Sequence, residues 1–233
     1  MKITLPSLFA FLFLFVFLDQ SHGKKDERPN IIVFLVDDYD KPETSPYGGK
    51  VLTPNLDRLA KEGMICHNAH VTSTVCTPSR YTFLTGRYAS SSHSNTFLDE
   101  CPKGTQALPA FNVGLESDRM NVGRVLADAG YATGFVGKYH VHDTDHSKEG
   151  SLFGDLDVPK NAKYSDQLNK RKFKLEKLQR ELIKKNGFTW AKNIYWGNLK
   201  HPFKGHNPDW TAQAALEFIC LLYTSPSPRD PTK

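Results

Sequence analysis

The segment 76–80, with the sequence CTPSR, combines a nucleophile with a cationic partner. Pro78 favours the first turn of a helix. Cys76 would then lie where free backbone N–H groups and the positive end of the helix dipole bind anionic groups. Arg80, further into the same helix, can hydrogen-bond the nucleophile or counter a developing negative charge. A disulfide, with Cys66 as one partner, and a buried thiol are the structural alternatives for Cys76.

Two adjacent carboxylates, Asp37 and Asp38, follow a run of six apolar residues at 31–36. Such a run predicts a strand buried on both faces of a parallel sheet, and open α/β sheets bind their ligands at the carboxyl ends of their strands. Neighbouring carboxylates repel each other unless a cation neutralises them. Their oxygens suit Ca²⁺, with Mg²⁺ as the less favoured ion. The pair therefore predicts a metal site, and a solvated turn is the alternative.

A second pair of polar residues, Lys138 and His140, follows a segment at 131–137 that is predicted to be a strand. Residues two apart on an extended segment point to the same side. A lysine can pair with an anionic oxygen, and a histidine can move protons near neutral pH. The pair is thus a candidate for catalysis, and an exposed strand end is the alternative.

The elements that must position these groups alternate between strand and helix patterns. Strands are predicted at 31–36, 64–71 and 131–137, and helices at 53–63, 78–86 and 122–130. The order strand, helix, strand, helix, helix, strand predicts an α/β fold with a largely parallel central sheet flanked by helices. A further helix is predicted at 212–219.

The N-terminal residues 1–23 have the pattern of a secretory signal peptide. Lys2 supplies the positive charge, residues 8–18 form an apolar run, and small residues precede position 24. The run is too short to cross a bilayer as a helix, which needs about 20 residues. The mature chain is predicted to enter the secretory pathway and to be secreted or lysosomal, with a membrane anchor as the alternative.

Together these motifs resemble the type I, arylsulfatase-type sulfatases of the alkaline phosphatase superfamily. The resemblance covers Arg28 to about Phe218 and is densest over 29–87 and 121–140. It implies a sulfatase-like α/β fold, incomplete in this chain. In that family the cysteine of Cys-x-Pro-Ser-Arg is oxidised to formylglycine in the endoplasmic reticulum. The implied metal ligands are Asp37, Asp38 and Cys76, and the implied catalytic residues are Cys76, Arg80, Lys138 and His140.

The implied activity is hydrolysis of a sulfate ester by a formylglycine nucleophile with one bound Ca²⁺. The implied partners are a sulfate-ester substrate and the formylglycine-generating enzyme, and neither nucleic acid nor a membrane span is expected. A sugar, a steroid or a sulfated polysaccharide remains open as the esterified alcohol. The family completes its calcium site with a later Asp–Asn pair that has no counterpart here.

The chain is therefore predicted to hold an N-terminal part of a catalytic domain, at 24–219, followed by an unassigned proline-rich tail at 220–233. Two alternatives remain. One is a phosphoesterase of the same superfamily. The other is a non-catalytic secreted fragment that binds sulfated glycans through a basic amphipathic helix.

The basic helix is predicted within 160–186. This stretch contains ten lysines and arginines but only three acidic residues, in a chain whose net charge is +5. The helical spacing of four leucines supports it; these are Leu168, Leu175, Leu178 and Leu182. Its outer face is either simply solvated or a platform for a sulfated polyanion.

Overall fold

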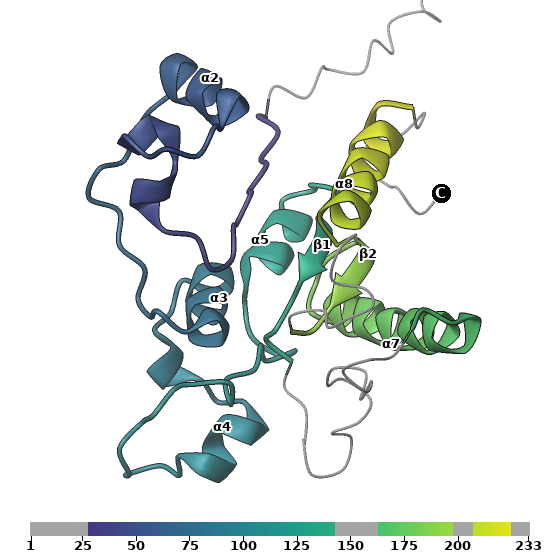
Figure 1. The fold of residues 1–233 in the computed structure, drawn as a ribbon. Coiled ribbons are helices and arrows are strands. Elements are labelled where there is room, and N and C mark those ends of the chain that lie inside the picture. The colour runs from purple at the N-terminus through teal and green to yellow at the C-terminus, as the bar shows by residue number, and fades with distance from the viewer. Residues whose placement is uncertain (1–27, 143–162, 198–206, 225–233) are drawn as a thin grey trace, which may run out of the picture. The chain divides into compact units, whose positions relative to one another are not determined.

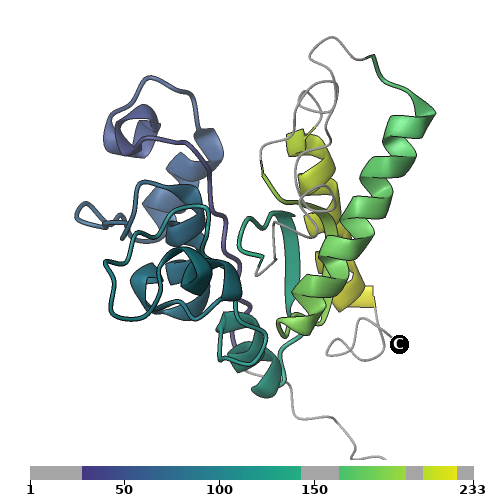
Figure 2. The same cartoon turned by 90° about the horizontal axis from the view of Figure 1, so that it is seen from below.

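The computed structural model describes residues 28–142, 163–197 and 207–224 (Figures 1 and 2). The chain divides into two units, Met1–Gly63 and Met64–Lys233. The predicted signal peptide lies outside the described residues, as do positions 225–233 of the predicted tail. Among the residues that are described, no helix has both the length and the apolar character needed to cross a membrane.

The first unit is helical in its described part. It contains two 3₁₀ helices and one α-helix, namely η1 (Lys41–Glu43), η2 (Ser45–Tyr47) and α2 (Pro54–Glu62). The predicted helix is confirmed: Pro54 occupies its first position, and the chain leaves the helix at Gly63. The Ser45 hydroxyl donates to the Asp57 carboxylate over 2.6 Å, which links η2 to α2.

The buried strand predicted at 31–36 is wrong. These residues form no strand, and their apolar side chains are exposed, from 45% at Val36 to 81% at Phe34. A strand buried on both faces needs neighbours that satisfy its backbone groups. The described part of this unit contains no strand with which 31–36 could pair. An apolar run indicates that its side chains prefer burial, but it does not show that a neighbouring strand is available for pairing.

The second unit contains most of the secondary structure. Its elements are α3 (Cys76–Thr85), η3 (Ala89–Ser91), α4 (Asn95–Glu100), α5 (Val122–Asp128), β1 (Gly134–Lys138), α7 (Asp166–Lys185), β2 (Trp190–Tyr195) and α8 (Asn207–Thr224). The strand predicted at 64–71 is absent from the structure, since these described residues pair with no other strand.

The helices predicted in this unit are all confirmed, with shifted ends. Helix α3 starts at Cys76 rather than at Pro78 and ends at Gly86, whose φ of 66° is left-handed, as glycine permits. Helix α5 is capped by the Asn121 side chain, which accepts from the Arg124 N–H. The helix predicted at 212–219 extends in both directions to form α8.

The sheet consists of two parallel strands in the described residues. Strand β1 pairs with β2 in the register Gly134 to Trp190 through Lys138 to Tyr195, with an irregularity after Val136. Helix α7 lies between the strands in sequence and packs against β2, and α8 packs against both strands (Figure 1). A parallel pair joined through a helix confirms the predicted α/β class, in the form of a small sheet flanked by helices.

A continuous apolar core lies where α3, β1 and β2 meet the helix α7. Four side chains in it are almost completely shielded from solvent, namely Tyr81, Tyr139, Ile183 and Ile194. Phe135 packs edge-on against both Tyr139 and Phe188, with ring centroids 5.3 Å apart in each pair. This core fixes the end of β1 against α7, and the polar pair Lys138 and His140 begins at that end.

Candidate active site

Cys76 is the first residue of α3, and its thiol lies against His140. The distance from Cys76 Sγ to His140 Nδ1 is 3.2 Å, within hydrogen-bonding range for sulfur. Val75, in extended conformation, precedes the helix, so the N–H groups of the first turn point toward its N-terminus. Cys76 is a half-buried free thiol, so a disulfide with Cys66 is not formed. The arrangement suits a nucleophile that meets an anion at a helix N-terminus.

Arg80 lies one turn after Cys76 and ties α3 to the end of β1. Its side chain is buried, and Nη1 donates to the Lys138 carbonyl oxygen over 2.7 Å. Because residues i and i+4 share a face of a helix, Arg80 and Cys76 are held on the same side of α3. The guanidinium therefore adds a fixed positive charge close to the thiol.

Lys138 and His140 are brought to the same region as Cys76 and Arg80. Both are buried, so an exposed strand end is excluded for this pair. The segment is not extended throughout, because His140 has a φ of 56°, in the left-handed region. Simple strand alternation therefore does not describe this segment, and the shared catalytic role of Lys138 and His140 stays a prediction.

The left-handed turn at His140 is held by backbone hydrogen bonds on both sides. The Tyr139 N–H donates to the Tyr195 carbonyl over 2.9 Å, and the Val141 carbonyl accepts from the Leu115 N–H over 2.8 Å. A non-glycine residue in this region costs of order 1 kcal/mol and persists where its surroundings over-determine it. The two bonds satisfy that condition.

Two aromatic rings border the His140 imidazole. Trp196 meets it edge-on, with 4.3 Å between ring centroids, and Phe111 lies tilted at 5.5 Å. More than half of the Phe111 side chain is exposed. The imidazole is thus confined by apolar surface on two sides while its Nδ1 faces the thiol.

Tyr139, between Lys138 and His140, anchors the segment from behind. Its side chain is fully buried, and its hydroxyl oxygen accepts from Asn186 Nδ2 over 2.7 Å. Burial raises the pKa of the Tyr139 phenol well above its usual value, with the Asn186 hydrogen bond as a smaller opposing effect. The phenol therefore stays neutral and acts as a packing residue.

Asp37 and Asp38 lie in the first unit, whereas Cys76 lies in the second. Asp37 is half-buried, and Asp38 is exposed with a left-handed φ of 51°. Among the described residues, no three His, Cys, Asp or Glu side chains are grouped as a metal site would require. The prediction that the two aspartates and residue 76 share an ion stays a prediction.

The donor types at these positions can still be compared with the expected ion. Two carboxylates are hard oxygen donors, which suit Ca²⁺ but provide only part of its six to eight ligands. A thiol is a soft ligand and does not suit Ca²⁺. Residue 76 would fit such a site only with an oxygen in place of its sulfur. The aspartates fit, and Cys76 as a thiol does not.

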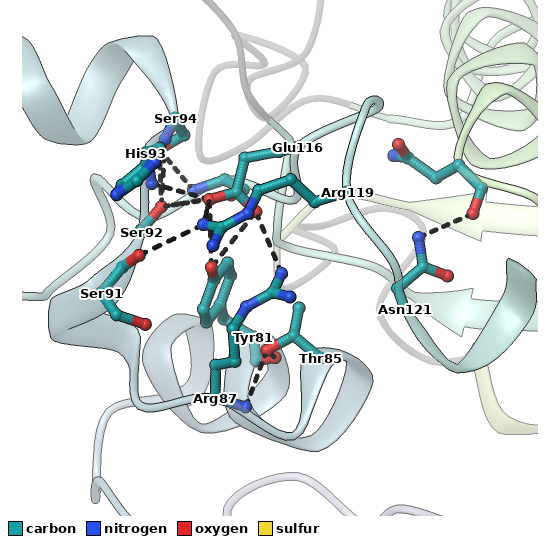
Figure 3. Close-up of polar contacts among 12 residues, drawn as sticks. Tyr81, Thr85, Arg87, Ser91, Ser92, His93, Ser94, Glu116, Arg119 and Asn121 are labelled. Atoms are coloured by element: carbon teal, nitrogen blue, oxygen red, sulfur yellow. Dashed lines mark hydrogen bonds and ion pairs between the residues drawn. The ribbon is translucent and has the colours of Figure 1, made fainter. Parts of the chain in front are cut away.

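A buried carboxylate beside α3, Glu116, was missed from the sequence (Figure 3). The Tyr81 hydroxyl lies 3.0 and 3.1 Å from its two oxygens, and the His93 N–H donates to Oε1 over 2.7 Å. Arg119 and Arg87 form ion pairs with it at 3.5 and 3.8 Å. These partners of Glu116 come from several segments of the chain. No regular spacing in the sequence relates them, so the sequence does not predict the cluster.

The Glu116 charge also acts on its tyrosine neighbour. Burial, and then the charge of Glu116, raise the pKa of the Tyr81 phenol. The neutral hydroxyl is therefore kept as a donor to the carboxylate, which is only 4% exposed. The hydrogen-bonded pair of Tyr81 and Glu116 therefore connects the buried face of α3 to the segment that carries Glu116.

The chain is similar to known proteins over most of its length. Residues 29–219 match the family model described as Sulfatase. Human steryl-sulfatase is 38% identical over 145 residues, which are 59% of this chain and 23% of that protein. N-acetylgalactosamine-6-O-sulfatase of Bacteroides thetaiotaomicron is 36% identical over 125 residues, 53% of this chain and 23% of the relative. The uncharacterized sulfatase YidJ of Escherichia coli is 31% identical over 180 residues, 72% of this chain and 33% of the relative. The chain thus spans a third or less of these relatives, and it belongs to the sulfatase family.

Proposed function

We propose that the protein hydrolyses sulfate esters with residue 76, converted from cysteine to formylglycine, as the nucleophile. The observation that carries the proposal is the 3.2 Å contact between Cys76 Sγ and His140 Nδ1 at the N-terminus of α3. A nucleophile beside a proton carrier and a helix N-terminus is suited to an anionic ester. Arg80, one turn along α3, adds a fixed positive charge.

In the proposed reaction, one hydroxyl of the aldehyde hydrate at residue 76 forms a bond to the ester sulfur. The bond between sulfur and the alcohol oxygen breaks, and the alcohol leaves with a proton. The second hydroxyl at residue 76 then loses its proton, the C=O bond re-forms, and sulfate departs. Water adds to the aldehyde to restore the hydrate.

The chain's own side chains serve these steps as follows. His140, in contact with residue 76, moves the proton near neutral pH. Arg80 and Lys138 supply positive charge for the sulfuryl oxygens as negative charge builds up. Asp37 and Asp38 would hold Ca²⁺, which when bound supplies further charge stabilisation.

The test is the mass of the tryptic peptide 62–80 from protein secreted by a eukaryotic host. Trypsin cleaves after Lys61 and Arg80, so this peptide contains both Cys66 and Cys76. Fragmentation must place the change from thiol to aldehyde on Cys76, and Cys66 is the internal control. An unmodified Cys76 in secreted protein would overturn the proposed nucleophile.

Activity is tested separately with an aryl sulfate and an aryl phosphate, each with calcium or with a chelator. Sulfate release that depends on calcium and is lost in Cys76→Ala supports the proposal. Preferential cleavage of the phosphate ester would support a phosphoesterase instead. We further propose that the chain passes through the secretory pathway, where the formylglycine-generating enzyme acts. N-terminal sequencing of secreted protein tests cleavage near Lys24.

A second candidate function is binding of a sulfated polysaccharide, favoured by a basic stripe on α7. The predicted helix is confirmed, with Leu175 and Ile183 on its buried face. The exposed lysines of the stripe are Lys170, Lys174, Lys177, Lys184 and Lys185. At 3.6 residues per turn they lie on the side opposite the buried face, over about 22 Å of helix. Among the described residues, only Lys184 of these lysines has an ion pair, with Glu181.

The stripe is tested by retention on heparin compared with neutral dextran. Lys170→Gln with Lys174→Gln should weaken binding and lower the slope of log K against log salt by about 1.4, at about 0.7 per lost contact. The matched control is Arg58→Gln with Lys61→Gln, two exposed cations in the first unit. Equal losses in both variants would show that only net charge matters.

A further inference from the structure

We propose that Glu116 is a positioning residue that holds α3, and with it Cys76, against the segment that carries His140. The inference rests on the proposed role of Cys76 as the precursor of the nucleophile. The contacts that carry this inference do not join Glu116 directly to Cys76. Glu116 acts through the elements on either side of it.

On the side of α3, Glu116 binds the residue that follows Arg80. The Tyr81 hydroxyl contacts both carboxylate oxygens, at 3.0 and 3.1 Å, from a side chain with no solvent exposure. Arg87, just beyond the end of α3, pairs with the same carboxylate at 3.8 Å. Glu116 therefore holds the helix at its middle and beyond its C-terminal end (Figure 3).

On the side of His140, the residue before Glu116 binds the backbone. The Leu115 N–H donates to the Val141 carbonyl over 2.8 Å, and Leu115 forms a parallel bridge with His142. Leu115 is itself buried in the core. Two consecutive residues, 115 and 116, thus connect the left-handed turn at His140 to α3.

A third set of contacts holds this connection in place. The His93 N–H and the Ser92 hydroxyl donate to Glu116 Oε1 over 2.7 and 3.3 Å, and Arg119 pairs with it at 3.5 Å. The five partners described above, Tyr81, Arg87, Ser92, His93 and Arg119, all present donors to the carboxylate. A glutamine at position 116 would turn one of its two acceptors into a donor that faces other donors, so α3 should loosen at this point.

The experiment measures how fast iodoacetamide alkylates each cysteine, by peptide mass spectrometry, in protein produced so that residue 76 remains a thiol. Cys76 is half-buried against His140 and reports on the position of α3. Cys101 is buried in the same unit and reports on general loosening. The readout requires neither enzymatic activity nor formylglycine, so it does not depend on the success of the proposed function.

The matched control is Glu176→Gln. Glu176 is as deeply buried as Glu116 and has its own arginine partner, Arg180, but it lies on α7. We expect Glu116→Gln to speed alkylation at Cys76 about tenfold while leaving Cys101 unchanged, and Glu176→Gln to leave Cys76 unchanged.

Three results would overturn the proposal. They are an unchanged rate at Cys76 in Glu116→Gln, an equal increase at Cys101, and an equal effect of Glu176→Gln. If Glu116→Gln does not fold, Tyr81→Phe removes only the hydroxyl that contacts the carboxylate. It should still speed alkylation selectively at Cys76, and an unchanged rate there would refute the proposal.

Discussion

Removing the hydroxyl of Tyr139 tests the packing behind the pair Lys138 and His140. The Tyr139 side chain is fully buried, and its oxygen accepts from Asn186 Nδ2 over 2.7 Å. Asn186 lies just after the end of α7, where its carbonyl accepts from Asn121 Nδ2 over 2.9 Å. The hydroxyl therefore joins the end of β1 to the end of α7 and the start of α5.

The magnitude follows from what Tyr139→Phe leaves behind. The variant keeps the ring but loses the acceptor, so the buried Asn186 Nδ2 group has lost its partner. Leaving a buried polar group unsatisfied costs about 1–3 kcal/mol, and we expect a loss of about 2 kcal/mol in the free energy of unfolding. At about 2–4 °C per kcal/mol for a chain of this size, the Tm should fall by about 4–8 °C.

The same variant should change how stability depends on pH. Because burial raises the pKa of Tyr139 above the ordinary value of 10.0, the folded protein keeps a proton that the unfolded chain loses above this pH. The resulting stability is complete below pH 10.0 and is lost as pH rises, by up to about 1.4 kcal/mol per unit for each tyrosine. Tyr81 shifts in the same direction, so Tyr139→Phe should remove only part of the slope.

The assay is urea unfolding followed by circular dichroism, at about pH 7, about pH 9 and about pH 11. The control is the double variant Tyr139→Phe with Asn186→Leu. Replacing both partners by apolar groups removes the unsatisfied donor and should recover about 1 kcal/mol relative to the sum of the single variants. The reasoning fails if Tyr139→Phe costs under about 0.5 kcal/mol, or if its alkaline slope equals that of the parent.

Two further variants test the packing around α5. Gly123→Ala places a Cβ 2.7 Å from the Phe188 ring, so it should cost about 1–3 kcal/mol in urea unfolding, and unchanged stability would mean that the ring moves freely. Asn121→Ala removes the cap for the Arg124 N–H and the bond to the Asn186 carbonyl, with an expected loss of about 2 kcal/mol. Asn121→Ser restores the cap alone and should recover part of that loss, whereas equal stability of both variants would refute the capping role.

Local signals in the sequence predicted the helices well. Pro54 and Gly63 bracket α2 as their backbone preferences require, and Gly86 ends α3 in a left-handed conformation. The leucine spacing identified α7, which buries Leu175 on its inner face. Each signal concerns neighbours within a few residues, and helices are built from such neighbours.

Strands and tertiary polar contacts were harder to predict, because they depend on distant partners. The apolar run at 31–36 looked like a buried strand but has no partner among the described residues of its unit. Strand β2 was missed because Lys192 and Asn193 interrupt its apolar pattern, and Asn193 has a left-handed φ of 54° at the irregular point of the pairing. This segment is a strand because it pairs with β1, and its residue composition alone does not indicate one.

For the candidate site, the sequence singled out Cys76, Arg80, Lys138 and His140, and the structure places these four residues in one region, while their catalytic roles stay predictions. The sequence did not predict the contacts that hold these four residues in place. Arg80 and Tyr81 are consecutive on α3, so their side chains leave the helix about 100° apart. One binds the Lys138 carbonyl and the other binds Glu116. Two contacts in different directions restrain the rotation of α3 about its own axis more than either contact alone. Cys76, one turn before Arg80, is thereby held beside His140.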